Sequence, residues 1–140
     1  MTTTLRRVLL IDDNPADLFL HRRVLTKAGC AERVDQCETG PQALEYLQTG
    51  DAGRPPHPEL IFLDINMPGM NGWEFLDAYE ELPADLRTGV IITMLTVSPS
   101  PGDRDAARAR PEVSEYLNKP LTLDMLRGVL ARYFPDVTCA

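Results

Sequence analysis

The chain has 140 residues, 44% hydrophobic and 25% charged, a composition typical of one globular domain over 1–140. Its net charge of −7 argues against nucleic acid as a partner, because binding phosphates requires a basic surface. The apolar runs are too short for a membrane span and no signal-peptide core follows Met1, so we expect a cytoplasmic protein.

Strand and helix patterns alternate along the whole chain. Short apolar runs without polar alternation are typical of strands buried on both faces of a parallel sheet. The predicted strands are residues 8–12, 33–37, 59–63, 90–95 and 116–118. The predicted helices are 14–27, 41–48, 73–82, 104–110 and a last helix that begins at Thr122. Five strands alternating with five helices predict an α/β fold, a doubly wound (βα)5 sheet of five parallel strands.

Local signals sharpen some of these elements. Asn14-Pro15 predicts the start of the first helix and Gly29 its end, but apolar residues around much of that helix leave its buried face undefined. The segment 33–37 is polar and is expected at an edge of the sheet. The helix 104–110 has only alanine as an apolar residue, so we expect it to be short and among the least stable elements.

Three carboxylates follow two of the predicted strands. Asp12 and Asp13 end the first strand, and Asp64 follows the third. In open α/β sheets, functional groups gather at the carboxyl ends of the strands, so these acids meet if the two strands are neighbours. Like charges this close need a cation or a shared proton. The sequence therefore predicts an all-oxygen site for Mg²⁺, with Mn²⁺ as the alternative ion.

Two further strand ends carry groups that suit an anion. Thr96 follows the fourth strand and Lys119 follows the fifth. A lysine ammonium pairs with phosphate as a point charge, and a threonine hydroxyl donates a hydrogen bond. A cation and an anion held side by side are typical of phosphoryl transfer, in which a carboxylate can itself be the nucleophile.

These motifs together resemble the receiver domain of bacterial two-component response regulators. The segments that carry the resemblance are Leu10-Ile11-Asp12-Asp13-Asn14, Asp64-Ile65-Asn66-Met67-Pro68-Gly69-Met70-Asn71-Gly72, Leu95-Thr96 and Tyr116-Leu117-Asn118-Lys119-Pro120. Each segment alone is a weak signal, but all of them occur in the right order and spacing over a core of about 7–134. The resemblance implies a flavodoxin-like sheet with strand order 2-1-3-4-5, in a single-domain regulator without an output domain.

The resemblance also implies a role for each acidic residue. Asp64 corresponds to the phosphoacceptor, Asp13 to a direct magnesium ligand and Asp12 to an acid that acts mainly through a bound water. The main-chain carbonyl of Asn66 completes the protein's share of the metal shell. Lys119 is expected to pair with the acceptor before transfer and with the phosphoryl group afterwards.

The remaining implied roles concern a switch. Thr96 is expected to move inward to the phosphoryl group, and Tyr116 to swing into the space that the threonine leaves; an edge-strand aromatic packed on the last helix is the structural alternative for Tyr116. The Lys119-Pro120 bond is expected to be cis. Val97 is bulkier than the residue usual after the switch threonine, so we expect it to hinder small phosphodonors and water.

The expected role is that of a signalling module and not of an enzyme. A sensor histidine kinase or a histidine phosphotransfer protein is the expected donor. The face formed by helix 104–110, strand 116–118 and the last helix is the expected output surface, for a downstream protein or a homodimer. Neither nucleic acid nor a membrane is an expected partner.

Two other functions remain open alternatives. A haloacid-dehalogenase-like phosphatase also combines an aspartyl nucleophile, magnesium, threonine and lysine. That family needs a second aspartate two residues after its nucleophile, where this chain has Asn66, and 140 residues leave no room for a cap domain. The other alternative is a receiver fold kept as an unphosphorylated scaffold, which is disfavoured because every chemical position carries the expected residue type.

The cysteines and histidines suggest no second site. Cys30, Cys37 and Cys139 are odd in number and lack the spacing of zinc ligands, so we expect three reduced structural thiols, with Cys37 buried. His21 and His57 are expected at the surface, and neither has a second ligand at metal-binding spacing.

Overall fold

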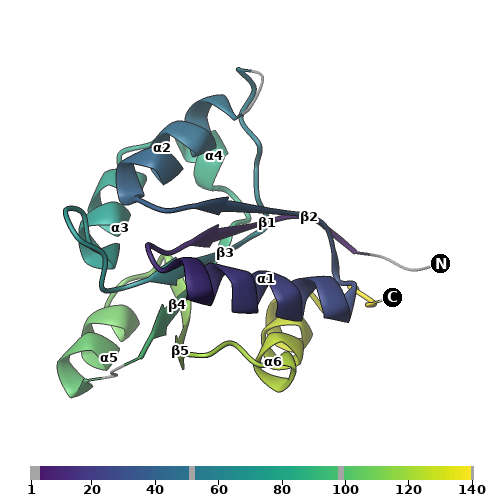
Figure 1. Cartoon of the computed structure of the whole chain (residues 1–140). Helices are drawn as coiled ribbons and strands as arrows, with labels where there is room; N and C mark the ends of the chain where they lie inside the picture. The colour runs from purple at the N-terminus through teal and green to yellow at the C-terminus, as the bar shows by residue number, and fades with distance from the viewer. Residues whose placement is uncertain (1–3, 51–52, 98–99, 140) are drawn as a thin grey trace.

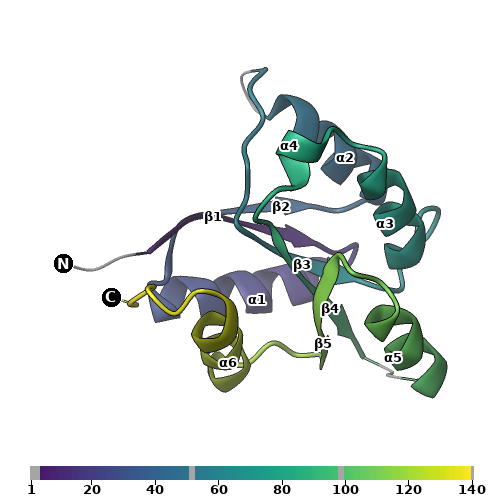
Figure 2. The ribbon, with the colours of Figure 1, turned by 180° about the vertical axis from the view of Figure 1, so that it is seen from behind.

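The computed structural model describes residues 4–50, 53–97 and 100–139, which form a parallel sheet between two layers of helices (Figures 1 and 2). The strand order is β2-β1-β3-β4-β5, which confirms the predicted 2-1-3-4-5 topology and places the polar β2 at an edge. The strands are β1 (Leu5–Ile11), β2 (Ala31–Cys37), β3 (Leu60–Asp64), β4 (Ile91–Thr96) and β5 (Val113–Asn118). The helices are α1 (Pro15–Ala28), α2 (Gly40–Thr49), α3 (Gly72–Glu80), α4 (Ala84–Arg87), α5 (Pro101–Arg108) and α6 (Leu123–Tyr133). Among these helices, none is long and apolar enough to cross a bilayer.

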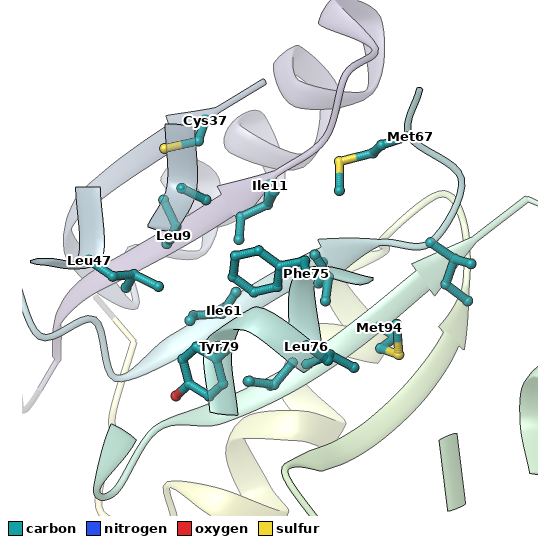
Figure 3. Close-up of a cluster of buried hydrophobic side chains, with 14 of the residues drawn as sticks. Leu9, Ile11, Cys37, Leu47, Ile61, Met67, Phe75, Leu76, Tyr79 and Met94 are labelled. Atoms are coloured by element: carbon teal, nitrogen blue, oxygen red, sulfur yellow. The ribbon is translucent and has the colours of Figure 1, made fainter. Parts of the chain in front are cut away.

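The two faces of the sheet bury two separate apolar clusters. Successive strand residues point to opposite faces, so neighbouring positions of β1 serve different clusters. Leu9 packs with Ile61 and with Phe75 of α3, on the face that α2 and α3 cover (Figure 3). Leu10 packs with Leu126 of α6, on the face that α1 and α6 cover. Every residue of the central strand β3 is buried, which explains its continuous apolar sequence.

Local capping sets the ends of α1 as the sequence predicts. The Asn14 side chain accepts hydrogen bonds from the backbone N–H groups of Ala16 and Asp17, and Pro15 occupies the first turn. Gly29 closes the helix in the left-handed region at φ 65°, a conformation that glycine adopts without strain. These contacts fix the start of α1 directly after Asp12 and Asp13, at the carboxyl end of β1.

The region between β3 and β5 differs in detail from the prediction. The four-residue α4 was not predicted, and β5 begins at Val113, before the predicted residue 116. α5 starts at Pro101 and not at residue 104, because the Ser100 hydroxyl accepts from the Asp103 N–H and proline fits the first helical turn. Within α5 the only buried residue is Ala107, in line with the expected short and weakly anchored helix.

The prediction of three reduced thiols is wrong for two of the cysteines. Cys30 and Cys139 form a disulfide with a Cα–Cα distance of 4.3 Å, across a sequence separation of 109. Cysteine spacing along the chain did not reveal the bond, because folding brings the segment that ends at Cys139 close to the start of β2 (Figure 1). Cys37 is a buried thiol, as predicted.

Candidate functional site

The sheet brings the three predicted acids together. β1 and β3 are neighbours, with Ile11 opposite Leu63, so the residues that follow at their carboxyl ends are adjacent. One carboxylate oxygen from each of Asp12, Asp13 and Asp64 lies within 4.8 Å of the others. Three acids at these distances form an oxygen-rich pocket of excess negative charge.

Asp12 and Asp13 differ in their surroundings. Asp12 is buried, and its two oxygens are both engaged: Oδ1 accepts from the Asn14 N–H at 3.0 Å, and Oδ2 lies 2.7 Å from the Lys119 ammonium. Asp13 is exposed, and within the described residues no hydrogen bond or ion pair engages its carboxylate. Asp13 therefore has the more available oxygens for a direct metal bond.

Lys119 enters the same pocket from the end of β5. Its Nζ lies 2.7 Å from Asp12, 2.8 Å from Asp17 and 3.3 Å from Asp64, and its side chain is only 6% exposed. Burial disfavours its charge, but the hydrogen bonds with Asp12 and Asp17 outweigh burial and raise the pKa of Lys119. The peptide bond between Lys119 and Pro120 is cis, the isomer that the resemblance implies.

The ionisation of Asp64 is disfavoured in the folded protein. Burial, followed by the negative charge of Asp12, raises its pKa to about 6, while Lys119 acts in the opposite direction. A carboxyl group in this position takes up a proton or gains a cation more readily than an ordinary aspartate. The pocket therefore favours binding of a positive ion at Asp64.

The start of α3 packs directly against the end of β3. The Gly72 N–H donates to the Ile65 carbonyl at 2.8 Å, and a Cβ at Gly72 would lie only 2.7 Å from the Asp64 carbonyl oxygen. A glycine is therefore needed at this close approach. Asn71 caps α3 in a capping box with Glu74, which fixes the end of the loop that holds Asn66.

Thr96 and Tyr116 lie on the two strands beyond the acids. Thr96 is fully buried at the end of β4, one position after Leu95, which pairs with Asp64. Its carbonyl accepts from the Lys119 N–H at 2.7 Å, which joins the threonine and lysine positions through the backbone. Tyr116 lies opposite Met94 and is partly buried, packing on the cluster between the sheet and α2 and α3.

Two residues of α1 that were not predicted from the sequence reach this site. Asp17 pairs with Lys119, as described above. His21 was predicted at the surface, but it is 1% exposed and its Nε2 accepts from the Leu121 N–H at 3.2 Å. Burial, followed by the charge of Lys119, lowers the pKa of His21, so the ring is neutral and can accept this hydrogen bond. No local signal in the sequence shows that this face of α1 turns towards Lys119, because the cap and the proline set only where the helix begins.

The donor set fits a hard divalent cation. Asp13 and Asp64 offer carboxylate oxygens, Asp12 has oxygens already bonded and suits contact through water, and Asn66 follows two residues after Asp64 in the adjoining loop. These are the ligand types that Mg²⁺ prefers. Beside them, the Lys119 ammonium lies 3.3 Å from Asp64, and Thr96 ends the strand next to β3.

The chain matches a known protein family and resembles several known proteins in sequence. The chain matches the response regulator receiver domain family over residues 8–131. The probable methanogenesis regulatory protein FilR2 of Methanothrix harundinacea is 31% identical over 121 residues, which are 86% of this chain and 76% of that protein. The signal transduction histidine-protein kinase BarA of Escherichia coli is 33% identical over 128 residues, which are 91% of this chain but only 13% of the kinase.

Solved structures extend the likeness to the whole described fold. The two-component response regulator from Cytophaga hutchinsonii superimposes with a TM-score of 0.85 at 31% identity, covering 95% of this chain and 99% of that one. The family match and the five-stranded topology cover the same part of the chain. The chain therefore belongs to the response regulator receiver domain family of two-component signalling.

Proposed function

We propose that this receiver domain is a magnesium-dependent phosphoacceptor and that Asp64 takes the phosphoryl group. The observation that carries the proposal is the position of Asp64, which shares an acidic pocket with Asp12 and Asp13 and lies 3.3 Å from the Lys119 ammonium. A carboxylate nucleophile, a cation site and a buried lysine are the parts that phosphoryl transfer to an aspartate requires.

The transfer step is a displacement at phosphorus. An Asp64 carboxylate oxygen attacks the phosphoryl group of a phosphohistidine, the P–O bond forms as the P–N bond breaks, and the imidazole leaves with the electron pair. Lys119 and the hydroxyl of Thr96 stabilise the charge on the phosphoryl oxygens. Asp13, Asp64 and the Asn66 carbonyl would hold magnesium, with Asp12 acting through water, and the ion would supply the remaining charge neutralisation.

The expected donor is a sensor histidine kinase or a histidine phosphotransfer protein. The likeness to part of the kinase BarA supports this class of partner. A donor that uses ATP acts in the cytoplasm, and we propose the same compartment for this chain. We also propose that 1–140 acts as a single receiver domain, a phosphoprotein and not an enzyme.

The output is proposed to pass through the surface of α5, β5 and α6. Tyr116 lies on β5 and Thr96 on β4 beside it, so a shift at the phosphoryl site would reach this surface by a short path. A downstream protein or a second copy of the chain is the proposed partner. The phosphatase alternative gains no support, because Asn66 stands where its second acid is needed.

Intact mass after incubation with Mg²⁺ and phosphoramidate or acetyl phosphate tests the acceptor. Wild type should gain one phosphoryl mass, and Asp64→Asn should gain none. Asp124→Asn, an exposed aspartate in the first turn of α6, is the matched control and should behave as wild type. Val97, which is exposed and follows Thr96, is expected to hinder small phosphodonors. The assay therefore also includes a phosphorylated kinase as the donor. Failure with every donor, or equal gain in Asp64→Asn, would overturn the proposal.

A further inference from the structure

Lys119 has three carboxylate partners, and the proposed reaction accounts for only two of them. Asp12 and Asp64 belong to the pocket at the ends of β1 and β3. Asp17 belongs to α1, yet at 2.8 Å it lies closer to the Lys119 ammonium than Asp64 does at 3.3 Å. Asp17 is therefore a competing counter-ion for the lysine that the acceptor needs.

The same face of α1 also holds the chain behind the lysine. His21 lies four residues after Asp17, so the two side chains project from neighbouring turns. Its Nε2 accepts from the Leu121 N–H, two residues after Lys119. α1 thus contacts both the ammonium of Lys119 and the backbone that follows it. The packing of α1 against this segment therefore holds Asp17 beside the lysine.

Exposure distinguishes Asp17 from the other two partners of the lysine. The Asp17 side chain is 22% exposed, whereas Asp12 and Asp64 are 5% and 7% exposed. Water can replace the lysine at Asp17, but it has little access to the two buried acids. Asp17 is therefore the partner that Lys119 gives up with the smallest penalty.

We propose that Asp17 is a positioning residue that draws Lys119 away from the acceptor and thereby disfavours the phosphorylated state. This inference rests on the proposed function. When a phosphoryl group arrives on Asp64, Lys119 shifts from Asp17 towards the phosphoryl oxygens, and the Asp17 carboxylate becomes solvated. The lost Lys119–Asp17 attraction, together with repulsion between Asp17 and the anion, opposes that state.

Binding of beryllofluoride, a phosphoryl analogue, tests the inference at equilibrium. The titration uses saturating Mg²⁺ and follows the bound analogue by fluorine NMR. Removing one charge from this partly exposed site should tighten beryllofluoride binding by about threefold to tenfold in Asp17→Asn. Asp17→Ala should tighten it in the same way, which provides a second variant if one of them folds poorly.

The controls separate this effect from loss of structure. Asp124→Asn removes an exposed acid from the first helical turn of α6 that is not among the ion-pair partners of Lys119, and should stay within about twofold of wild type. A structural defect at Asp17 would weaken binding, whereas the proposed competition tightens it. Unfolding curves without the analogue verify that each variant is folded.

The outcomes also separate this inference from the proposed function. If wild type binds no beryllofluoride, or Asp64→Asn binds it as well as wild type, the acceptor assignment fails. If wild type binds and Asp64→Asn does not, the acceptor assignment stands. In that case, folded Asp17 variants with unchanged or weaker binding would overturn the competing role of Asp17 alone.

Discussion

At the carboxyl end of the sheet, Asp12, Asp64 and Lys119 bury charged groups, whereas the amino end buries Leu5 and Cys30 among apolar side chains. The Cys30–Cys139 disulfide joins the C-terminal segment to that apolar end. β1 thus begins in the apolar region next to the disulfide and ends directly before Asp12, at the acidic pocket.

The amino end of the sheet supports the stability of the fold, whereas the carboxyl end carries the candidate functional site. The raised pKa of Asp64 means that its ionised form is disfavoured in the folded protein, so the acidic pocket weakens the fold until a cation binds. The ion pairs at the amino end join opposite charges, such as Arg6 with Glu59, and the disulfide there restricts the unfolded chain. The following experiments test this division.

Breaking the disulfide should have the largest effect on stability. It links residues separated by 109 positions, and closing a loop of this length stabilises a fold by up to about 4–5 kcal/mol. Urea unfolding with and without a reductant should show this loss in wild type. Cys139→Ser should already have the lower stability and should not respond to the reductant. An unchanged wild-type midpoint under reduction would contradict the stabilising role of the amino end.

At the carboxyl end of the sheet, neutralising Asp64 should increase the stability of the fold. The pKa of Asp64 is about 6 in the folded protein and near the ordinary 3.8 when unfolded, so its ionisation destabilises the fold as pH rises between these values. Without a metal, Asp64→Asn should raise the free energy of unfolding by up to about 2–3 kcal/mol near pH 8. The gain should vanish towards pH 4, where wild-type Asp64 is protonated. A gain of equal size at both pH values would exclude Asp64 ionisation as its cause.

Magnesium affinity should depend on the same ionisation. Below a pH of about 6 a proton competes with the cation at Asp64, so the dissociation constant should rise about tenfold per pH unit, or about 1.4 kcal/mol. Calorimetric titration of Mg²⁺ between pH 5 and 8 measures this slope. Cys139→Ser should show the same slope, because the disulfide lies at the other end of the sheet. A slope that changes on breaking the disulfide would show that the two ends are coupled.

An exposed ion pair at the amino end should matter least. Arg6 lies 3.9 Å from Glu59, and its side chain is 77% exposed. Arg6→Ala should lower the free energy of unfolding by less than about 1 kcal/mol, as solvent screens such pairs. Urea unfolding at low salt gives the most sensitive comparison. A larger loss would mean that charge supports the amino end as well.

Local sequence signals were sufficient for the main elements and for the positions of the acids. Asn14 and Thr122 cap their helices through contacts with residues two or three positions away, so their roles could be predicted without tertiary information. Asp12 and Asp64 could be placed together because each follows a buried strand, and strands of a parallel sheet end at a common edge. The metal and phosphoryl roles of these residues remain predictions.

The surroundings of Lys119 could not be predicted in the same way. Lys119 meets Asp17 across 102 positions, and Leu121 meets His21 across 100. α1 is apolar around much of its circumference, so periodicity did not show which face turns towards the sheet and α6. His21 was consequently assigned to the surface, and Asp17 was not considered.

By itself, the sequence determined the alternation of strands and helices, the caps and the residue types at the strand ends, because these depend on neighbours along the chain. Only the tertiary structure decided which of three acids lies nearest to Lys119, that His21 is buried, and that Cys30 meets Cys139. Those contacts join residues that lie far apart along the chain. Their formation depends on how α1, the sheet and the C-terminal segment pack together, and no local pattern encodes that packing.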